Sequence, residues 1–179
     1  GTAQKDITRL NSSQKLREAG IAYILQDKSV FPNMTVEENL WMGGYLADSP
    51  TAAKAATEKV FAKYGRLAER RGQKAGTLSG GERRLLEISR ALIMEPKVLL
   101  VDEPSVGLAP ILVNRMIAKI KELKERRQLT VLMAEQNFNQ AIKIADRGYI
   151  IVHGEIAFEG ASAEDLRSND MIKRYYLGV

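Results

Sequence analysis

The sequence predicts an α/β protein with a mostly parallel sheet, and three observations support this fold class. Short apolar segments of strand length alternate with longer stretches that have helical periodicity. The segment 97–101 is an almost continuous apolar run, as expected of a buried strand. The 179 residues include 45% apolar and 27% charged residues, which suits one domain with a real core.

Each expected strand is a short run bounded by polar or turn residues. The predicted strands are 20–25, 97–101, 129–134 and 148–152. Gln26 follows directly on the first of them. The dipeptide His153-Gly154 predicts a turn that joins the fourth strand to a short partner at 155–158, with His153 as a surface turn residue.

The predicted helices lie mainly between the first two strands. Thr35 and Glu38 have the spacing of a capping box, which predicts a helix through Trp41, so that Trp41 and Met42 are expected in the core of a helical insert. Further helices are predicted at 51–64, at 82–94, from Pro110 onward, and as two short helices between Ser162 and Leu177. In the Pro110 helix, the residues expected to pack on the sheet are Leu112, Met116, Ile120 and Leu123.

Composition excludes several classes of protein. There is no cysteine, hence no disulfide framework, and no apolar run approaches the roughly 18 residues of a membrane helix. The net charge is +5 and the pI about 9.4, but the basic residues of 66–74 and 119–127 are mixed with glutamate. We therefore expect a solvated charged face and no nucleic-acid partner.

The segment Leu78-Ser79-Gly80-Gly81-Glu82 stands directly before a predicted helix. Backbone N–H groups at the positive end of a helix bind anions, and glycine lets a phosphate approach the main chain closely. By itself such a turn is typical of any helix start, so its interpretation depends on its neighbours.

Two carboxylates, Asp102 and Glu103, follow the predicted strand 97–101. Ligands of α/β sheets bind at the carboxyl ends of the strands. An Asp there can hold Mg²⁺, and a neighbouring Glu can orient or deprotonate an attacking water. On their own the two acids are equally consistent with a solvated loop.

Taken together, these elements occur in the order and approximate spacing of an ABC-type ATPase. From about Asp6 to its end, the chain resembles an ABC nucleotide-binding domain, a P-loop NTPase-type fold. Within that family it is most similar to the second ATPase subunit of branched-chain amino-acid importers. The stretches that carry this similarity are 20–26, 30–32, 35–40, 103–105, 107–110, 135–137, 145–149 and 176–178. The stretch 79–84 also resembles the lipopolysaccharide-export ATPase, which ranks second.

The resemblance implies roles for individual residues. It assigns nucleotide binding to Gln26, Ser79, Gly80, Gly81 and Glu82. It implies that Asp102 and Gln26 organise Mg²⁺. It also implies that Glu103 is the catalytic base, with Gln136 beside it where family members usually carry a histidine.

The resemblance further implies two partners. One is a second ABC ATPase domain, in a homo- or heterodimer that encloses two ATP molecules. The other is a pair of transmembrane permease subunits that contact Asp27–Phe31. The protein is accordingly expected at the cytoplasmic face of the membrane, as a peripheral subunit.

Three departures from the family pattern stand out. The sequence holds no Gly-x-x-x-x-Gly-Lys-Ser/Thr motif, which supplies most phosphate contacts. Gln136 stands at the histidine position, and Ala109 stands where an Asp is expected, both as in the importer branch. We therefore expect this chain alone to bind ATP and Mg²⁺ weakly or not at all, and its enzyme activity stays open.

The resemblance divides the chain into a partial RecA-like ATPase core at 1–34 and 76–160, a helical insert at 35–75 and C-terminal helices at 161–179. The N-terminal β region and the P-loop strand are expected to be missing, by truncation or because the sequence is a fragment. We then expect the strands 129–134 and 148–152 to pair directly, or to pair with another chain.

Two other functions compete with an ATPase that powers branched-chain amino-acid uptake. One is a non-catalytic module that binds a partner domain but holds ATP poorly. The other is a soluble ABC ATPase of nucleic-acid metabolism, which the basic charge suggests but which usually has tandem domains or long insertions.

Overall fold

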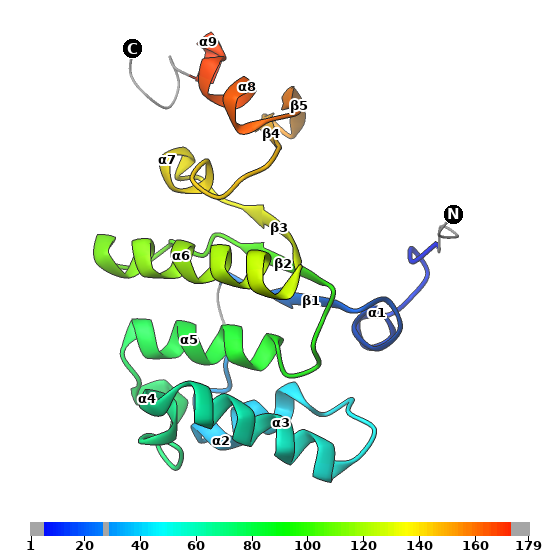
Figure 1. Cartoon of the computed structure of the whole chain (residues 1–179), viewed down its shortest axis with the longest axis vertical. Coiled ribbons are helices and arrows are strands. Elements are labelled where there is room, and N and C mark those ends of the chain that lie inside the picture. Colours follow the sequence, from blue (N-terminus) through cyan, green and yellow to red (C-terminus); the bar gives the residue numbers. More distant parts are fainter. Residues whose placement is uncertain (1–5, 27–28, 173–179) are drawn as a thin grey trace.

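The computed structural model describes residues 6–26 and 29–172, apart from the side chains of Arg127 and Met171. The first three strands are separated by helices along the chain, and the last two strands are consecutive (Figure 1). The strands are β1 (Ile21–Ile24), β2 (Val98–Asp102), β3 (Thr130–Ala134), β4 (Gly148–Val152) and β5 (Glu155–Gly160). The helices are α1 (Ser12–Ala19), α2 (Val36–Gly43), α3 (Pro50–Lys63), α4 (Gly65–Ala68), the 3-10 helix η1 (Ala75–Thr77), α5 (Gly80–Ala91), α6 (Pro110–Arg127), α7 (Phe138–Ala141), α8 (Ala163–Ser168) and α9 (Asp170–Ile172).

A parallel three-stranded sheet in the order β1-β2-β3 forms the centre of the molecule, which confirms the predicted fold class. Side chains alternate between its two faces. On the buried face, Ala22, Leu99 and Val131 lie side by side in register. They pack with helices α5 and α6, whose buried contributions to this core are Ile88, Leu92, Met116, Ile120 and Leu123.

The opposite face of the sheet is more open in the part of the chain that the structure describes. Tyr23, Leu100 and Leu132 are adjacent in register on this face. Tyr23 is 53% exposed and Leu132 is 63% exposed. The sheet therefore has one fully packed face, although its strands are nearly all apolar.

Helices α2, α3 and α4 form the helical insert, on the other side of α5 from the sheet (Figure 1). Thr35 caps α2 through the predicted capping box with Glu38. The insert has its own core, in which Leu40 and Leu67 are fully buried and pack with Leu86 of α5. Because Leu86 and Ile88 of α5 belong to different cores, this helix joins the insert to the sheet.

Strands β4 and β5 form a separate antiparallel hairpin. Its turn is formed by His153 and Gly154, both with positive φ (52° and 85°), as the sequence predicted. The hairpin does not pair with β3 within the described residues, so the expectation of direct pairing between these strands is wrong. The hairpin packs instead on a third core, in which Ile142, after α7, lies with Ile150 and Leu166.

Some element boundaries differ from the expectations. Helix α5 begins at Gly80, earlier than predicted, because Ser79 already serves as its N-cap. Helix α1 was not predicted, although Asn11 and Gln14 form a capping box and Gly20 ends the helix in the left-handed region. Of the predicted C-terminal helices, α8 and the start of α9 are present, and the rest lies outside the described residues.

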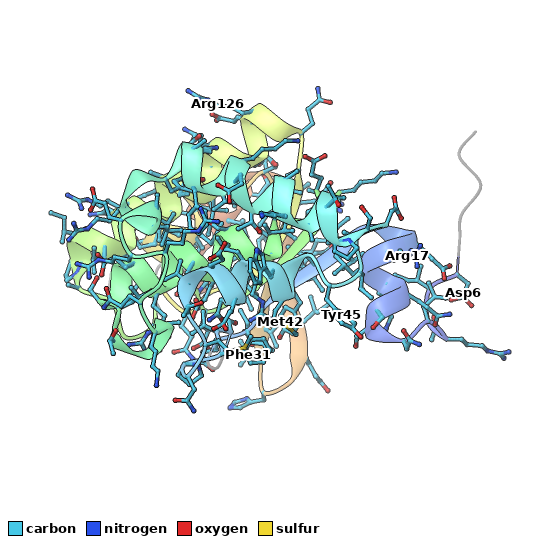
Figure 2. The ribbon with its side chains drawn as sticks, turned by 90° about the horizontal axis from the view of Figure 1, so that it is seen from below. Asp6, Arg17, Phe31, Met42, Tyr45 and Arg126 are labelled. Atoms are coloured by element: carbon cyan, nitrogen blue, oxygen red, sulfur yellow. The ribbon has the colours of Figure 1, made fainter. Side chains whose placement is uncertain are left out.

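The surface of the insert also differs from the expectation. Trp41 and Met42 are 43% and 39% exposed, so they are not core residues. Phe31, Met42 and Tyr45 lie along the same side of the molecule when it is viewed from below (Figure 2). None of the described helices has both the length and the apolar character that a membrane span requires.

Candidate functional site

The candidate site lies where β1, β2 and β3 end. Because the three strands are parallel neighbours, their carboxyl ends meet at one edge of the sheet. Gln26 follows β1, Asp102 ends β2 and Glu103 follows it, and Gln136 follows β3. The fold therefore brings together four residues that are up to 110 positions apart in the sequence (136 − 26).

The Glu103 carboxylate is held between two glutamine side chains. The Gln26 amide nitrogen donates to Glu103 Oε2 at 2.6 Å, and the Gln136 amide nitrogen donates to Glu103 Oε1 at 2.7 Å. Both donors are neutral, so the carboxylate is oriented without being paired to a cation by either contact. An oriented carboxylate on a partly exposed loop can accept a proton from water.

The main chain of Glu103 is in the left-handed region, with φ of 41°. Such a conformation costs on the order of 1–3 kcal/mol for a residue other than glycine. Three contacts hold it: the Glu103 N–H donates to the Ala134 carbonyl at 2.9 Å, and the Glu103 carbonyl accepts from Arg84 Nη2 and from the Val106 N–H, each at 3.2 Å. The backbone is thus fixed from β3 on one side and from α5 on the other.

Asp102 has a different environment from Glu103. Its Oδ2 accepts a hydrogen bond from the Tyr23 hydroxyl at 3.3 Å. Partial burial, and then the negative charge of Asp102, raise the pKa of the Tyr23 hydroxyl, so Tyr23 stays a donor at neutral pH. The described residues contain no group of three acids, histidines or cysteines that could hold a metal by themselves.

Mg²⁺ nevertheless fits the chemistry of this site. It prefers oxygen ligands and usually keeps waters and substrate phosphates alongside one or two protein groups. Asp102 offers a carboxylate and Gln26 an amide oxygen, while the Gln26 nitrogen is engaged by Glu103. These two side chains are suitable ligands for Mg²⁺ only if a phosphate or water completes the shell.

The Ser79-Gly80-Gly81 turn opens α5. The Ser79 hydroxyl donates to Glu82 Oε2 at 2.8 Å, and the Ser79 N–H donates to the same oxygen at 3.0 Å, which completes a capping box. Ser79 and Gly80 are exposed. A side chain at Gly81 would approach Leu112 at 3.2 Å, so the turn lies against the start of α6.

Glu82 is anchored by two arginines of the helical insert. Arg66 Nε lies 3.0 Å and Arg70 Nε lies 2.7 Å from Glu82 Oε1. The hydrogen bond from the Ser79 side chain, followed by the backbone bond and these cations, lowers the pKa of Glu82. Glu82 therefore acts in this structure as a charged cap that connects the turn to the insert.

Sequence reasoning missed two contacts that support the site. Glu135 accepts hydrogen bonds from the Ser105 hydroxyl at 2.8 Å and the Asn137 N–H at 2.8 Å, which ties together the loops after β2 and β3. Arg84 and Glu87 form a buried ion pair at 2.6 Å. Helical spacing was a usable signal, because Arg84 stands three residues before Glu87 and four before the apolar Ile88, which places Arg84 beside both on the helix surface.

The segment Asp27–Phe31, expected to face a permease, lies partly outside the described residues, because 27 and 28 are not described. Its second half is tied to both neighbouring helices. The Phe31 N–H donates to the Asn39 side chain at 2.8 Å, and the Arg90 guanidinium lies 4.9 Å from the centre of the Phe31 ring. The surface beside the site is thus anchored to α2 and α5.

Comparison with known proteins gives consistent matches across the chain. A family model described as ABC transporter matches residues 1–106. The chain is 42% identical over 174 residues to the high-affinity branched-chain amino acid transport ATP-binding protein BraG of Pseudomonas aeruginosa, covering 97% of this chain and 73% of that protein. It is 36% identical to the probable branched-chain amino acid transport ATP-binding protein LivF of Archaeoglobus fulgidus, covering 89% of this chain and 67% of the relative.

Two further matches widen the comparison. The lipopolysaccharide export system ATP-binding protein LptB of Acidithiobacillus ferridurans is 35% identical, with 98% of this chain and 71% of that protein covered. Among solved structures, an ATP-binding cassette of an ABC transporter in its ADP conformation matches with a TM-score of 0.79 and 31% identity. This match covers 98% of the chain and 75% of the solved chain.

Proposed function

The chain belongs to the ABC transporter family of ATP-binding proteins, and on that premise we propose that it hydrolyses ATP to power the uptake of branched-chain amino acids. The observation that supports this most directly is the Glu103 carboxylate between Gln26 and Gln136 at the ends of three parallel strands. Identity to two branched-chain amino-acid transport proteins supports the choice of substrate.

In this proposal Glu103 is the catalytic base. Its two carboxylate oxygens are fixed by amides, so an attacking water can be oriented and its proton accepted with little rearrangement. Gln136 cannot carry a proton, so the burden of proton transfer falls on Glu103. Gln26 positions Glu103 from the β1 side and offers its amide oxygen to Mg²⁺ together with Asp102.

Mg²⁺, when bound, would neutralise charge on the phosphates of ATP. Asp102 and Gln26 would hold it through their side-chain oxygen atoms. Gly80 and Gly81 present backbone N–H groups at the start of α5 to the γ-phosphate of an ATP held by a second ATPase domain, and Ser79, whose own N–H is engaged by Glu82, lies at the same turn. Glu82 supports this turn from beneath through its bonds to Ser79.

The proposal needs a phosphate-binding element that the printed sequence does not contain. Without the Gly-x-x-x-x-Gly-Lys-Ser/Thr motif, the backbone N–H cradle and the lysine that grip the β- and γ-phosphates are absent from this sequence. We therefore expect weak or no binding of Mg²⁺-ATP by the chain alone. A second ATPase domain and permease subunits that contact 27–31, at the cytoplasmic face of a membrane, complete the proposed assembly.

The test uses calorimetry of Mg²⁺-ATP binding and an assay of ATP turnover. The chain is studied alone and after fusion to the part of the P. aeruginosa relative that it does not cover. We expect turnover only in the fused protein. Glu103→Gln should lower that turnover by roughly 10²- to 10⁴-fold, because it removes the base but keeps the shape.

Glu159→Gln, an exposed acid on β5, is the matched control and should leave turnover unchanged. A fused protein that binds Mg²⁺-ATP but hydrolyses none would favour the non-catalytic alternative. Equal turnover in Glu103→Gln and wild type would remove Glu103 as the base.

Lipopolysaccharide is the second candidate for the transported substrate. It is favoured by 35% identity to a lipopolysaccharide export ATPase and by the resemblance of the stretch 79–84 to that class of ATPase. Reconstitution with the permeases of each system separates the two. Leucine-dependent stimulation of ATP turnover supports amino-acid uptake, whereas stimulation by lipopolysaccharide in the export complex supports the alternative.

A further inference from the structure

Arg84 and Glu87 are two charged residues in the interior of the protein. Their side chains are each only 7% exposed, and Arg84 Nη1 lies 2.6 Å from Glu87 Oε2. Removing two charges from water is costly, and the attraction between them offsets this only if further hydrogen bonds satisfy the remaining groups. The partners of the guanidinium therefore indicate what the pair does.

The guanidinium of Arg84 reaches the ends of two strands. Its Nη1 donates to the Leu25 carbonyl at 3.3 Å and has a weaker contact with the Gln26 carbonyl at 3.5 Å. Its Nη2 donates to the Glu103 carbonyl at 3.2 Å. One side chain thus contacts the main chain beneath both Gln26 and Glu103, whose side chains hydrogen-bond to each other.

The contact between Arg84 and Glu103 is made at a residue whose backbone conformation is strained. Glu103 has a φ of 41°, in the left-handed region. Its N–H donates to the Ala134 carbonyl of β3, and its carbonyl accepts from Arg84 of α5 and from the Val106 N–H of its own loop, each at 3.2 Å. Loss of the Arg84 bond would leave this carbonyl held by its own loop and no longer tied to α5, so the carboxylate would shift away from the Gln26 and Gln136 amides.

We propose that Arg84 is a positioning residue that sets the Glu103 carboxylate and Gln26 in register with helix α5, with Glu87 holding the guanidinium in place. Arg84 lies little more than one helical turn beyond Ser79, so the residues that start α5 and the residues that end β1 and β2 are connected through one side chain. Its catalytic meaning rests on the proposed function. Movement of the Ser79 turn is then transmitted to the base through Arg84.

The experiment measures the side-chain amide resonances of Gln26 and Gln136 in the ¹⁵N-labelled chain, assigned by their loss in Gln26→Ala and Gln136→Ala. Arg84→Lys keeps the charge beside Glu87, but a single ammonium cannot serve both strand ends as a guanidinium does. We expect both amide resonances to move toward the positions of solvated glutamines. The melting temperature should stay within about 3 °C of wild type.

A second variant keeps the proposal testable if Arg84→Lys fails to fold. Replacing both members of a buried ion pair by apolar residues of similar size is often neutral for stability or stabilising. The double variant Arg84→Met with Glu87→Met should therefore stay folded and show the same two displaced resonances. Arg90→Lys is the matched control, because Arg90 lies on the same helix but contacts Phe31 and the Ser29 carbonyl.

A purely structural role for Arg84 predicts that the Gln26 and Gln136 resonances change only in proportion to lost stability. Wild-type resonances in a folded Arg84→Lys or double variant would overturn the proposal, as would equal displacement in Arg90→Lys. In the fused ATPase, Arg84→Lys should lower kcat by about 10- to 100-fold with KM nearly unchanged. If the wild-type fusion has no turnover, the proposed function fails, and the resonances still decide the positioning role.

Discussion

Glu82 and Glu103 are two glutamates at the ends of regular elements, and they are held by opposite kinds of partner. Glu82 forms ion pairs with Arg66 and Arg70 and accepts a hydrogen bond from the Ser79 hydroxyl. Its charge is therefore neutralised by the protein. Glu103 accepts its two side-chain hydrogen bonds from the neutral amides of Gln26 and Gln136. A carboxylate paired with cations stabilises structure, whereas one oriented by amides remains able to take a proton.

The difference extends to the two regions around them. The helical insert is held to α5 by charge contacts, by capping boxes and by its own core around Leu40 and Leu67. The site at the ends of the strands is held by a few hydrogen bonds between loops, such as the two from Ser105 to Glu135. The insert is thus held by many packing and charge contacts. The site depends on a few polar contacts between side chains that can also bind a substrate.

The largest effect expected from this comparison is on stability. Glu82→Ala removes the partner of Ser79 in the capping box and two partly buried ion pairs, which should lower the free energy of unfolding by about 1–2 kcal/mol. Glu103→Ala should change it by about 0.5 kcal/mol or less, because the groups it releases are exposed. Urea unfolding measures both.

Glu69→Ala is the control for Glu82→Ala. Glu69 also pairs with Arg66, at 2.8 Å, but its side chain is 62% exposed and makes no cap. Its loss should cost less than about 0.5 kcal/mol. Equal destabilisation by Glu69→Ala and Glu82→Ala would mean that burial and capping do not distinguish these acids.

A smaller effect is expected from pH. The pKa of Glu82 is lowered in the folded protein, first by the Ser79 side chain and then by Ser79 N–H and the arginines. Its contribution is therefore fully present above the unfolded value of about 4.3 and is lost as pH falls through the folded pKa. The stability difference between wild type and Glu82→Gln should shrink as the pH falls below about 5. A difference that stays constant over this range would contradict the assignment.

A small effect on stability is also expected at the glycine turn. Gly81 has no left-handed requirement, and a methyl group there would meet only the flexible end of Leu112, at 3.2 Å. Gly81→Ala should change the free energy of unfolding by less than about 1 kcal/mol, since alanine also favours the helix. In the fused ATPase it should weaken ATP turnover, because the phosphate approaches the main chain there. Unchanged turnover would show that Gly81 has no role in phosphate binding.

The sequence predicted much of the local structure for physical reasons that are local. The capping box of Thr35, the first residue of α6 at Pro110 and the turn at His153-Gly154 all depend on neighbouring residues. The strands were found because short, nearly continuous apolar runs are too brief for helices. Helix α1 escaped because its apolar content is low, although Asn11 and Gly20 marked both of its ends.

Contacts between segments that are distant in the sequence were not predicted correctly. Trp41 and Met42 were expected in a core but lie exposed, because hydrophobicity alone does not tell which face of α2 meets α3 and α5. The strands 129–134 and 148–152 were expected to pair, but the packing of Ile142 and Leu166 gave the hairpin its own core. In both cases the outcome depended on which other segments pack against the residue or strand, and the sequence alone does not show this.

The sequence by itself determined the order of the sheet strands and of most helices, and the cap at Thr35, because these follow from composition and short-range spacing. Only the tertiary structure placed Gln26, Glu103 and Gln136 in hydrogen-bond contact, since parallel strands bring their ends together irrespective of sequence distance. It also revealed Arg84 beneath them. The role of a buried charged residue cannot be predicted from the sequence, because it depends on which carbonyl groups the fold places beside it.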